Sequence, residues 1–532
     1  MVSLQPHPNE RRRQVLQREI DSLKSAEERN RLGQFATPYP LALEIAGYIK
    51  SLLKPHHPRP RFADPSIGSG SFYSAASSVF GCDGLEHAMG IELDPAFADA
   101  AESLWGMSGL QMIRGDFTQV IAQGGCPPAP TLILANPPYV RHHHLNQDDK
   151  LRLQSLVLQR TGIKVSGLAG LYVYFLLLAT TWMEKGGIAA WLIPSEFMDV
   201  NYGAALRDFL SKHITLLRIH RFDPADVQFN DALVTSAIVV FENKPAPADH
   251  RAEFTFGGSL EHPIVSDKIT LPQLRETAKW SSFPRHADND RMGSNKSEGP
   301  CLGDFFRIQR GIATGCNAFF LMERAKAKQL GIPASFLRPI LPSPRHLAAT
   351  LVETEADGYP RIAPQLCLLD CKLPEELLAT KHPKLWDYLQ TAESLDIKKG
   401  YILRSRNPWY RQEQRQAAPF LCTYMGRGTP DKLPFRFIWN RSQAVATNLY
   451  LMLTPTGGLA AMLSAYPERA ARIHDWLGNL TGGELRSEGR VYGGGLNKIE
   501  PKELARISTQ SLVELWPEIM PQSNRQMNLF TV

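Results

Sequence analysis

The stretch TLILANPPYV, residues 131–140, joins an aliphatic run directly to Asn136, Pro137, Pro138 and Tyr139. Two adjacent prolines do not fit a helix interior or a central strand, so the pattern predicts a buried strand that ends in a stiff turn. The Asn136 side-chain oxygen and the Pro137 carbonyl are two rigid acceptors, which suit the two protons of an exocyclic –NH2 group. Tyr139 adds a stacking face. The tetrapeptide therefore predicts chemistry at an amine nitrogen of glutamine, adenine or another –NH2 substrate.

A glycine-rich loop follows an earlier apolar run, in the stretch DPSIGSG. Asp64 stands at the predicted strand end, and Gly68 and Gly70 follow it. Glycines let a backbone approach a ligand closely, and the next helix offers free N–H groups at its start. The third glycine of the dinucleotide fingerprint G-x-G-x-x-G is replaced by Tyr73, so a dinucleotide site is not predicted. A plain tight turn is the alternative explanation.

Two more predicted strands end in acidic residues. Glu92 stands where an acid typically accepts hydrogen bonds from ribose hydroxyls, whereas Asp94, followed by Pro95, fits a helix N-cap. Asp116 can accept a hydrogen bond from an exocyclic amine, and Phe117 can stack on a purine. For these last two residues, a solvated carboxylate and a core aromatic are the competing interpretation.

These strand ends must be positioned by a sheet. From residue 62 to residue 242, apolar strand-like runs alternate with helix-like segments, which predicts an α/β fold with a mainly parallel sheet covered on both faces. In such sheets ligands bind at the carboxyl ends of the strands. Before the sheet we expect a charged helix over residues 9–31, then a helix to about Leu53 with Thr37 as its cap and Pro38 in its first turn.

A chain of 532 residues exceeds the usual size of a single core, so more than one domain is expected. Pro, Ala and Asp in NKPAPADH suggest a linker at residues 245–250, which separates a catalytic domain (1–244, with the N-terminal helix at 1–31) from a mixed α+β domain (251–532). Residues 1–244 carry 23 Lys and Arg against 24 Asp and Glu, a net charge of −1. Because the net charge of the whole chain is +6, residues 245–532 carry a net charge of +7. A basic half suits a polyanionic partner, but a mildly basic surface without a partner is the alternative, which charge alone favours.

The seven cysteines form no Cys-x-x-Cys pair, and no metal site is predicted. The longest apolar run, within residues 171–183, is too short for a membrane span, so no membrane partner is expected. The charged N-terminal thirty residues carry no secretory pattern, which indicates a cytoplasmic protein with free thiols.

In chain order the motifs are GQFATP, DPSIGSGSF, GIELD, GDF, NPPY, LYVYF with GGIAAWLIPSEF, and QFNDALV. This set resembles the class I S-adenosylmethionine-dependent methyltransferases. More narrowly, it is similar to the gamma class of DNA adenine-N6 methyltransferases from bacterial restriction–modification systems, over roughly residues 30–244. The chain departs from that family in two places: Ser66 and Ile67 replace a common Ala-Cys, and Gly170 replaces an Asp or Asn.

The resemblance implies a Rossmann-like methyltransferase domain, S-adenosylmethionine as the cofactor, and a target adenine flipped out of double-stranded DNA. In that family Asn136 and Pro137 grip the N6 amine, while Tyr139 and Phe229 sandwich the base. Phe229 as a core aromatic is the alternative. The family's cofactor-binding positions correspond here to Thr37, Pro38, Asp64, Gly68, Gly70, Glu92, Asp116 and Phe117.

The C-terminal half resembles the target-recognition region of the same family. Its segments around residues 305–321, 401–415 and 485–501 mix basic residues with aromatics and glycines, as phosphate and base contacts require. The residues expected to contact DNA as a group are Arg310, Arg404, Arg406, Arg490 and Lys498. Surface charges without a partner are the alternative for any one of them.

No nuclease signature is found, so a cognate restriction endonuclease would be a separate protein. The tail QMNLF resembles the short motif with which bacterial proteins bind the replication sliding clamp, through Gln526, Leu529 and Phe530. Docking of the tail on its own domain is the alternative. The resemblance to these methyltransferases implies a location in the bacterial cytoplasm, in association with the nucleoid. The rival functions are a protein-glutamine N5 methyltransferase, an RNA base methyltransferase and an inactive DNA-binding specificity module.

Overall fold

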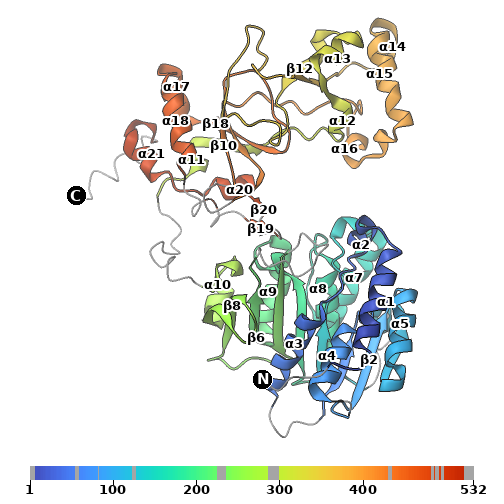
Figure 1. The fold of residues 1–532 in the computed structure, drawn as a ribbon. Coiled ribbons are helices and arrows are strands. Elements are labelled where there is room, and N and C mark those ends of the chain that lie inside the picture. Colours follow the sequence, from blue (N-terminus) through green and yellow to red (C-terminus); the bar gives the residue numbers. More distant parts are fainter. Residues whose placement is uncertain are drawn as a thin grey trace, which may run out of the picture. The chain divides into compact units, whose positions relative to one another are not determined.

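The computed structural model divides the chain into two compact units, Met1–Gly293 and Ser294–Val532 (Figure 1). The residues that it describes are 6–53, 59–81, 83–122, 128–223, 235–284, 299–428, 434–480, 485, 490–492 and 496–520.

The first unit is built on a nine-stranded sheet with the order β3-β2-β1-β4-β5-β7-β6-β8-β9. Strands β3, β2, β1, β4 and β5 pair in parallel, and β7 lies antiparallel between β5 and β6. The predicted parallel α/β sheet is thereby confirmed. The strands are β1 (Arg61–Asp64), β2 (His87–Glu92), β3 (Leu110–Arg114), β4 (Leu132–Ala135), β5 (Ile188–Pro194), β6 (Thr215–Arg221), β7 (Ser236–Glu242), β8 (Arg251–Gly258) and β9 (Pro263–Thr270).

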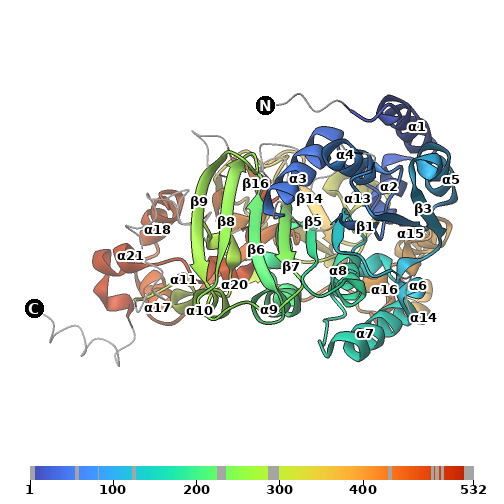
Figure 2. The same cartoon turned by 90° about the horizontal axis from the view of Figure 1, so that it is seen from below.

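Helices cover both faces of this sheet (Figure 2). One apolar cluster joins the sheet to α3 (Tyr39–Leu52), α4 (Ser71–Phe80) and α5 (Pro95–Trp105). The other joins it to α6 (Phe117–Ala122), α7 (Gln147–Thr161), α8 (Leu171–Trp182), α9 (Ala204–Lys212) and α10 (Leu271–Glu276). Ten of the twelve residues of α8 are buried, as its uniformly apolar sequence predicts.

The segment before the sheet differs from its prediction in two ways. The single helix expected over 9–31 is two helices, α1 (Glu10–Ser22) and α2 (Ala26–Leu32), because the Ser25 side chain caps a new start by accepting from the Glu28 N–H. Helix α3 begins after Pro38 without a side-chain cap, so the predicted cap role of Thr37 is wrong. The cap predicted for Asp94 is confirmed, because its carboxylate accepts from the Ala96 N–H at 3.0 Å.

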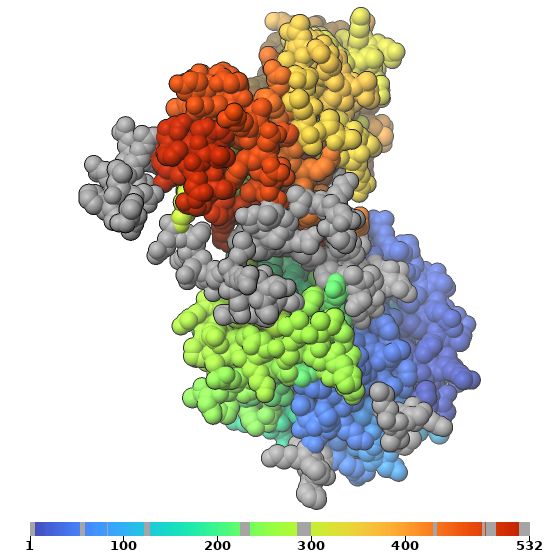
Figure 3. All heavy atoms as spheres, turned by 60° about the vertical axis from the view of Figure 1, so that its left-hand side comes forward, coloured from blue at the N-terminus to red at the C-terminus, as the bar shows by residue number. Residues whose placement is uncertain are grey.

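Strands β8 and β9 belong to the first unit, although the sequence analysis places them beyond the linker at 245–250. Strand β8 pairs in parallel with β6, and Phe254 and Trp280 are each only 1% exposed. The loop between β8 and β9 is tied to α3, because the Leu260 N–H donates to the Glu44 carboxylate. Figure 3 shows this yellow-green part of the chain in continuous contact with the blue and green parts of the unit. The stretch 245–250 is therefore a turn within the sheet.

With the boundary at residue 293 instead of 250, the difference in net charge between the two parts of the chain is larger. Residues 1–293 hold 29 Lys and Arg against 31 Asp and Glu, a net charge of −2, which leaves +8 for residues 294–532. The first unit is nearly neutral, and the second unit alone carries the basic character of the chain.

The second unit is mixed α+β, as predicted. A five-stranded sheet with the order β10-β18-β15-β17-β13 is accompanied by two three-stranded sheets, β11-β14-β12 and β16-β20-β19. The strands are β10 (Phe306–Arg310), β11 (Leu321–Glu323), β12 (Leu337–Ile340), β13 (Leu351–Val352), β14 (Leu366–Leu369), β15 (Phe420–Thr423), β16 (Met425–Arg427), β17 (Phe437–Asn440), β18 (Tyr450–Pro455), β19 (Arg490–Tyr492) and β20 (Leu496–Lys498).

Short helices surround these sheets. They are α11 (Leu302–Phe305), α12 (Asn317–Phe320), α13 (Arg324–Gln329), α14 (Glu375–Lys381), α15 (Pro383–Ser394), α16 (Tyr401–Arg404), α17 (Gly457–Ala465), α18 (Arg469–Gly478), α20 (Pro501–Leu504) and α21 (Gln510–Leu515). Across the described parts of both units, no helix has the length and apolarity needed to cross a membrane.

The boundary can be tested with two fragments of the first unit. A fragment of residues 1–293 should unfold cooperatively and remain monomeric. A fragment of residues 1–250 loses β8, β9 and buried aromatics such as Phe254, and it leaves β6 as an edge strand. We expect it to be less stable by more than about 3 kcal/mol, or to aggregate. Circular dichroism melting and size-exclusion chromatography measure both effects; equal melting temperatures would place the boundary back at residue 250.

Candidate active site

Two loops meet where the order of the parallel strands reverses, between β1 and β4. The glycine-rich loop follows β1, and the NPPY loop follows β4. The Ser66 hydroxyl donates to the Asn136 carbonyl at 3.1 Å, so the two loops are joined directly. In open α/β sheets this switch point is where ligands bind, and the structure therefore brings the two most informative motifs into one crevice region.

The side-chain amide of Asn136 is held in one orientation. Its Nδ2 donates to the Phe35 carbonyl at 2.8 Å and to the Thr37 hydroxyl at 3.1 Å. Because the Phe35 carbonyl can only accept, the NH2 group must face it, and the oxygen must face away; the Thr37 hydroxyl, which can accept or donate, accepts in this arrangement. That oxygen, Oδ1, is buried and has no hydrogen-bond partner within the described residues. An unpaired buried acceptor is costly, so this atom is a ready position for a donor from a ligand.

Tyr139 is fixed by the same N-terminal segment. Its backbone N–H donates to the Gly33 carbonyl at 3.1 Å, and its ring lies 5.5 Å from that of Phe35. Gly33 has a φ of +68°, and a Cβ there would lie 2.4 Å from the Tyr139 nitrogen, so only glycine fits. The Tyr139 hydroxyl donates to the Leu192 carbonyl, and burial raises the pKa of this phenol. Residues 33–37 thus contact the NPPY loop through Gly33, Phe35 and Thr37 and fix its conformation.

A buried acid, Asp64, and a half-buried acid, Glu92, flank the glycine-rich loop. Asp64 is 2% exposed and accepts from the Ser66 N–H, while Glu92 accepts from the N–H groups of Gly68 (2.9 Å) and Asp94 (2.8 Å). Burial raises the pKa of Asp64 to about 8, and it also raises the pKa of Glu92. No Lys or Arg in the described ranges forms an ion pair with either acid. The pair is therefore suited to a ligand that brings positive charge or hydroxyl donors.

The two glycines of the loop do different work. Gly68 has a φ of +56°, and a Cβ there would meet nothing within 4 Å, so the loop is open at this point. Gly70 has a φ of +90°, and its Cβ would lie 2.3 Å from Nε1 of Trp105, which donates to the Ser69 carbonyl. Gly68 therefore leaves room for a ligand, whereas Gly70 makes room for the Trp105 indole.

Phe117 takes the core position that the sequence analysis gave as its alternative, whereas Asp116 is held by Thr118 and Arg152 rather than simply solvated. Asp116 accepts from the N–H and the hydroxyl of Thr118, both at 2.8 Å, at the start of α6. Phe117 is 2% exposed and packs against Phe175 and Trp182, with ring centroids 5.1 Å and 6.0 Å away, so its ring has no free face. A partly exposed Asp116 carboxylate can still accept from a ligand.

Sequence reasoning missed Leu93. This side chain directly follows Glu92 at the end of β2, and it is 69% exposed despite being apolar. Leu93 therefore presents an exposed apolar side chain directly after the acid at the end of β2, whereas the Phe117 ring lies in the core. The position of Leu93 one residue after the acid of GIELD was the available signal.

Sequence reasoning also missed Tyr172, the second residue of LYVYF. Its hydroxyl is buried without a hydrogen-bond partner in the described structure, and burial, helped by nearby Glu196, raises its pKa well above the ordinary value. A Cβ at Gly170 would lie 2.9 Å from the Tyr172 ring and 3.4 Å from the Val140 carbonyl. The departure from Asp or Asn at residue 170 thus gives this ring its space beside the NPPY loop.

In the second unit, two of the predicted DNA-contacting residues meet on one ring. The Arg310 guanidinium lies 4.1 Å and the Lys498 ammonium 5.2 Å from the centroid of Tyr424. The Tyr424 hydroxyl donates to Glu500, which pairs with Lys498 at 3.0 Å. Arg490 stands opposite Lys498 in the β19–β20 register. These three positions therefore form one group.

The remaining candidates do not join that group. Arg406 donates to the carbonyls of Ala313 (2.6 Å) and Thr314 (3.1 Å) and to the Gln412 side chain, which makes it a brace inside the unit. Arg404 is exposed at the end of α16. The remaining predicted site residues lie outside the described part of the chain: Phe229, Gln526, Leu529 and Phe530.

A parallel sheet with a glycine-rich loop, two acids and an NPPY turn at adjoining strand ends has the fold of the class I methyltransferases. The comparisons with known proteins are more specific. The family described as Eco57I restriction-modification methylase matches residues 131–228, and the C-terminal domain of Type II methyltransferase M.Eco57I matches residues 280–528. The second match begins close to the boundary at residue 293, rather than at residue 251.

Two curated relatives cover most of the chain. Type II methyltransferase M.XamI from Xanthomonas campestris pv. amaranthicola is 29% identical over 496 residues, which are 91% of this chain and 86% of the relative. Type II methyltransferase M.AccI from Acinetobacter calcoaceticus is 24% identical over 507 residues, or 92% and 87% of the two chains. The chain belongs to the DNA methyltransferases of restriction–modification systems.

One solved structure supports the fold. The Type IIL restriction-modification enzyme MmeI in complex with DNA aligns with a TM-score of 0.54 at 14% identity, over 83% of this chain and 65% of that enzyme. This chain therefore spans less than two thirds of the length of MmeI.

The buried Asp64 predicts a pH dependence of stability. Its pKa is raised in the folded state, so its contribution to stability is full below about pH 4 and is lost as the pH rises through about 8. Between pH 5 and pH 8, wild type should lose at least about 1 kcal/mol of unfolding free energy that Asp64→Asn keeps. Urea unfolding of the 1–293 fragment measures the difference. Asp83→Asn, at an exposed position, is the matched control, and parallel curves for wild type and Asp64→Asn would contradict the prediction.

Proposed function

We propose that this chain transfers a methyl group from S-adenosylmethionine to N6 of an adenine flipped out of double-stranded DNA. The observation that carries the proposal is the buried, unpartnered Oδ1 of Asn136, which is oriented by Phe35 and Thr37. An acceptor fixed in this way, beside a proline carbonyl and an aromatic ring, is complementary to an amine whose two protons must be held.

The described residues fit the cofactor. Asp64 is buried and Glu92 is half-buried, and neither pairs with a cation in the described ranges, which suits an amino-acid end with positive charge and a sugar with two hydroxyls. Gly68 leaves open space in the loop, and Leu93 offers an apolar surface for a purine. In this proposal Gly70 shapes the loop, and Asp116 accepts from the exocyclic amine of the cofactor adenine.

Thr37 and Pro38 border the methionine end of the cofactor in this proposal, and they act mainly as supports. The Thr37 hydroxyl receives the Asn136 amide, and its carbonyl accepts from the Ser71 hydroxyl at 2.9 Å. Phe117 packs in the core against Phe175 and supports the loop that carries Asp116. In this proposal the exposed Leu93 stacks on the cofactor adenine, a role that the resemblance assigned to Phe117.

The residues of the NPPY turn then do the work of positioning. S-adenosylmethionine, when bound, supplies a methyl group on a sulfonium, whose C–S bond breaks as the N–C bond forms. Asn136 Oδ1 and the Pro137 carbonyl accept hydrogen bonds from the two N6 protons and direct the nitrogen lone pair toward the methyl carbon. Pro138 stiffens the turn, and Tyr139 with Phe229 stacks the flipped base. The N6 proton leaves to solvent, and catalysis comes from orientation and preorganised acceptors.

DNA is recognised by the second unit in this proposal. Its charge of +8 supplies the electrostatic attraction to phosphates that the first unit lacks. Arg310 and Lys498 on Tyr424, with Arg490 opposite Lys498 in the strand register, form the group that contacts DNA, and Arg404 is an exposed additional cation. Arg406 is left out, because its guanidinium braces the loop at residues 313–314.

We further propose two protein partners. One is a separate cognate endonuclease, and the other is a sliding clamp bound through Gln526, Leu529 and Phe530. A cytoplasmic, nucleoid-associated location follows from the proposed substrate.

One experiment separates the proposed reaction from its rivals. The protein is incubated with methyl-labelled S-adenosylmethionine and with DNA, RNA and protein acceptors, and the labelled base is identified by mass spectrometry. Label in N6-methyladenine of DNA supports the proposal. Label only in RNA or in a glutamine side chain would favour the rival methyltransferases, and no label in any acceptor would favour an inactive specificity module.

The Asn136→Ala variant tests the central residue. Removing the oriented acceptor should lower kcat by at least about 100-fold, because preorganised polar groups typically contribute that much. The dissociation constant for S-adenosylmethionine should stay within about 3-fold, since one lost hydrogen bond to a supporting residue changes affinity little. Asn30→Ala, at an exposed asparagine of α2, is the matched control. Full methyl transfer by Asn136→Ala would remove the assignment.

A further inference from the structure

Helix α1 contains a buried ion pair between Glu10 and Arg13, which the charged sequence of the helix does not predict. Most charged residues of α1 are exposed, but Glu10 and Arg13 are only 2% and 3% exposed. The Arg13 guanidinium forks onto the Glu10 carboxylate, with distances of 2.8 Å from Nε to Oε2 and 2.7 Å from Nη2 to Oε1. Burying two charges is expensive, and replacing such pairs with apolar residues is often neutral. Packing of α1 alone therefore does not account for the pair.

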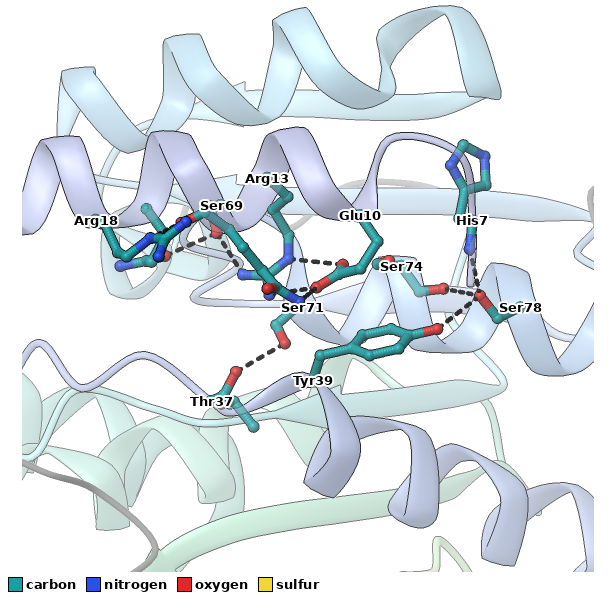
Figure 4. Close-up of polar contacts among 12 residues, drawn as sticks. His7, Glu10, Arg13, Arg18, Thr37, Tyr39, Ser69, Ser71, Ser74 and Ser78 are labelled. Atoms are coloured by element: carbon teal, nitrogen blue, oxygen red, sulfur yellow. Dashed lines mark hydrogen bonds and ion pairs between the residues drawn. The ribbon is translucent and has the colours of Figure 1, made fainter. Parts of the chain in front are cut away.

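The remaining arm of Arg13 reaches the glycine-rich loop. Its Nη1 donates to the Ser69 hydroxyl at 3.0 Å, and that hydroxyl donates to the Gln17 side-chain oxygen at 2.7 Å (Figure 4). The Ser69 carbonyl accepts from the Trp105 indole at 2.8 Å. Ser69 is 2% exposed, so its hydroxyl is fully engaged by α1 and faces the protein rather than a ligand.

Ser69 sits between the two positions where the loop backbone is left-handed. Gly68 and Gly70 have φ values of +56° and +90°, and glycines lose the most conformational freedom on ordering. The Gly68 N–H meets Glu92 on the crevice side, and the Ser71 hydroxyl meets the Thr37 carbonyl. A loop with two left-handed glycines needs contacts from outside to stay in one conformation, and α1 supplies the contacts to the Ser69 hydroxyl between them.

We propose that α1 is a latch on the cofactor loop: Arg13, oriented by Glu10, holds the loop in its ligand-ready conformation through the Ser69 hydroxyl and so sets the affinity for S-adenosylmethionine. Arg13 and Ser69 are positioning residues that do not touch the ligand. The inference rests on the proposed function for the identity of the ligand. Beyond that function, it assigns part of the control of S-adenosylmethionine affinity to α1, a helix that contains none of the methyltransferase motifs.

The alternative is that α1 only packs. Ile20 forms a small apolar cluster with Phe97 and Ala100, which would stabilise the unit without the ion pair. A packing role predicts that removing the Arg13–Ser69 contact lowers the melting temperature and leaves the affinity of the folded protein unchanged. A latch predicts a change in affinity with the fold intact.

The experiment uses the full chain and three changes. Ser69→Ala removes the hydroxyl and keeps the ion pair. Glu10→Leu with Arg13→Met removes both charges together, which avoids a lone buried charge. The triple variant combines them, and Arg12→Met, at an exposed arginine on the same helix, is the control. Calorimetry gives the dissociation constant for S-adenosylmethionine, methylation kinetics on DNA give KM and kcat, and hydrogen exchange reports on residues 66–70.

For a latch, Ser69→Ala and the double variant each raise the dissociation constant and the KM for S-adenosylmethionine about 5- to 10-fold, as expected for the loss of one hydrogen bond of typical strength. The kcat at saturating cofactor stays within about 2-fold, and residues 66–70 exchange faster. The triple variant resembles either parent variant, because all three remove one contact. Ser69→Thr, which keeps a hydroxyl, restores affinity.

Wild-type affinity in folded Ser69→Ala, or independent effects that multiply in the triple variant, would overturn the latch. Failure of the wild type to bind S-adenosylmethionine is a different result, and it counts against the proposed function. In that case unchanged hydrogen exchange at residues 66–70 in Ser69→Ala would still reject the latch, and faster exchange would support it.

Discussion

The orientation of a single amide organises the candidate site. Asn136 can present its oxygen to a ligand only because Phe35 and Thr37 both accept from its nitrogen. The Phe35 carbonyl can only accept, so it fixes the orientation of the amide; a donor at that place would pair with the oxygen and remove the free acceptor. Leaving that oxygen buried and unpaired costs about 1–3 kcal/mol, which the rest of the first unit must offset.

The elements that fix this amide come before the sheet in the chain. Gly33 and Phe35 hold the NPPY loop, and Thr37 holds both that loop and the start of α4 through Ser71. Arg13 then holds the glycine-rich loop from α1. The strand ends bring the loops together, but the N-terminal segment decides their conformations. The two acids add a second cost of the same kind, since Asp64 and Glu92 are both less acidic than in water until a ligand compensates them.

Periodic features of the sequence predicted the sheet, its helices and the Asp94 cap, because they depend on neighbouring residues. The errors arose where a distant partner decides. The Thr37 hydroxyl is a plausible cap until Asn136, 99 residues away, takes it. Phe117 is a plausible stacking ring until Phe175 and Trp182 cover it.

The domain boundary has the same cause. The stretch 245–250 has the composition of a linker, and no local pattern reveals that β8 pairs with β6 rather than starting a new domain. Arg406 resembles its neighbour Arg404 in sequence, but its partners are carbonyls more than ninety residues earlier. Asn136 was found because its surroundings are also encoded locally, in two prolines that permit only a turn.

The division of charge between the units follows from what each must bind in the proposed function. Cations around Asp64 and Glu92, which form no ion pair within the described residues, would lower the pKa values of the two acids and compete for the ligand. The first unit is accordingly near neutral, at −2. Attraction to a phosphate backbone requires the opposite, and the second unit carries +8. There Tyr424 holds Arg310 and Lys498 by cation–π contacts, so these side chains are ordered before any partner arrives. Separating the two charge environments into two folded units lets each be optimised without loss to the other.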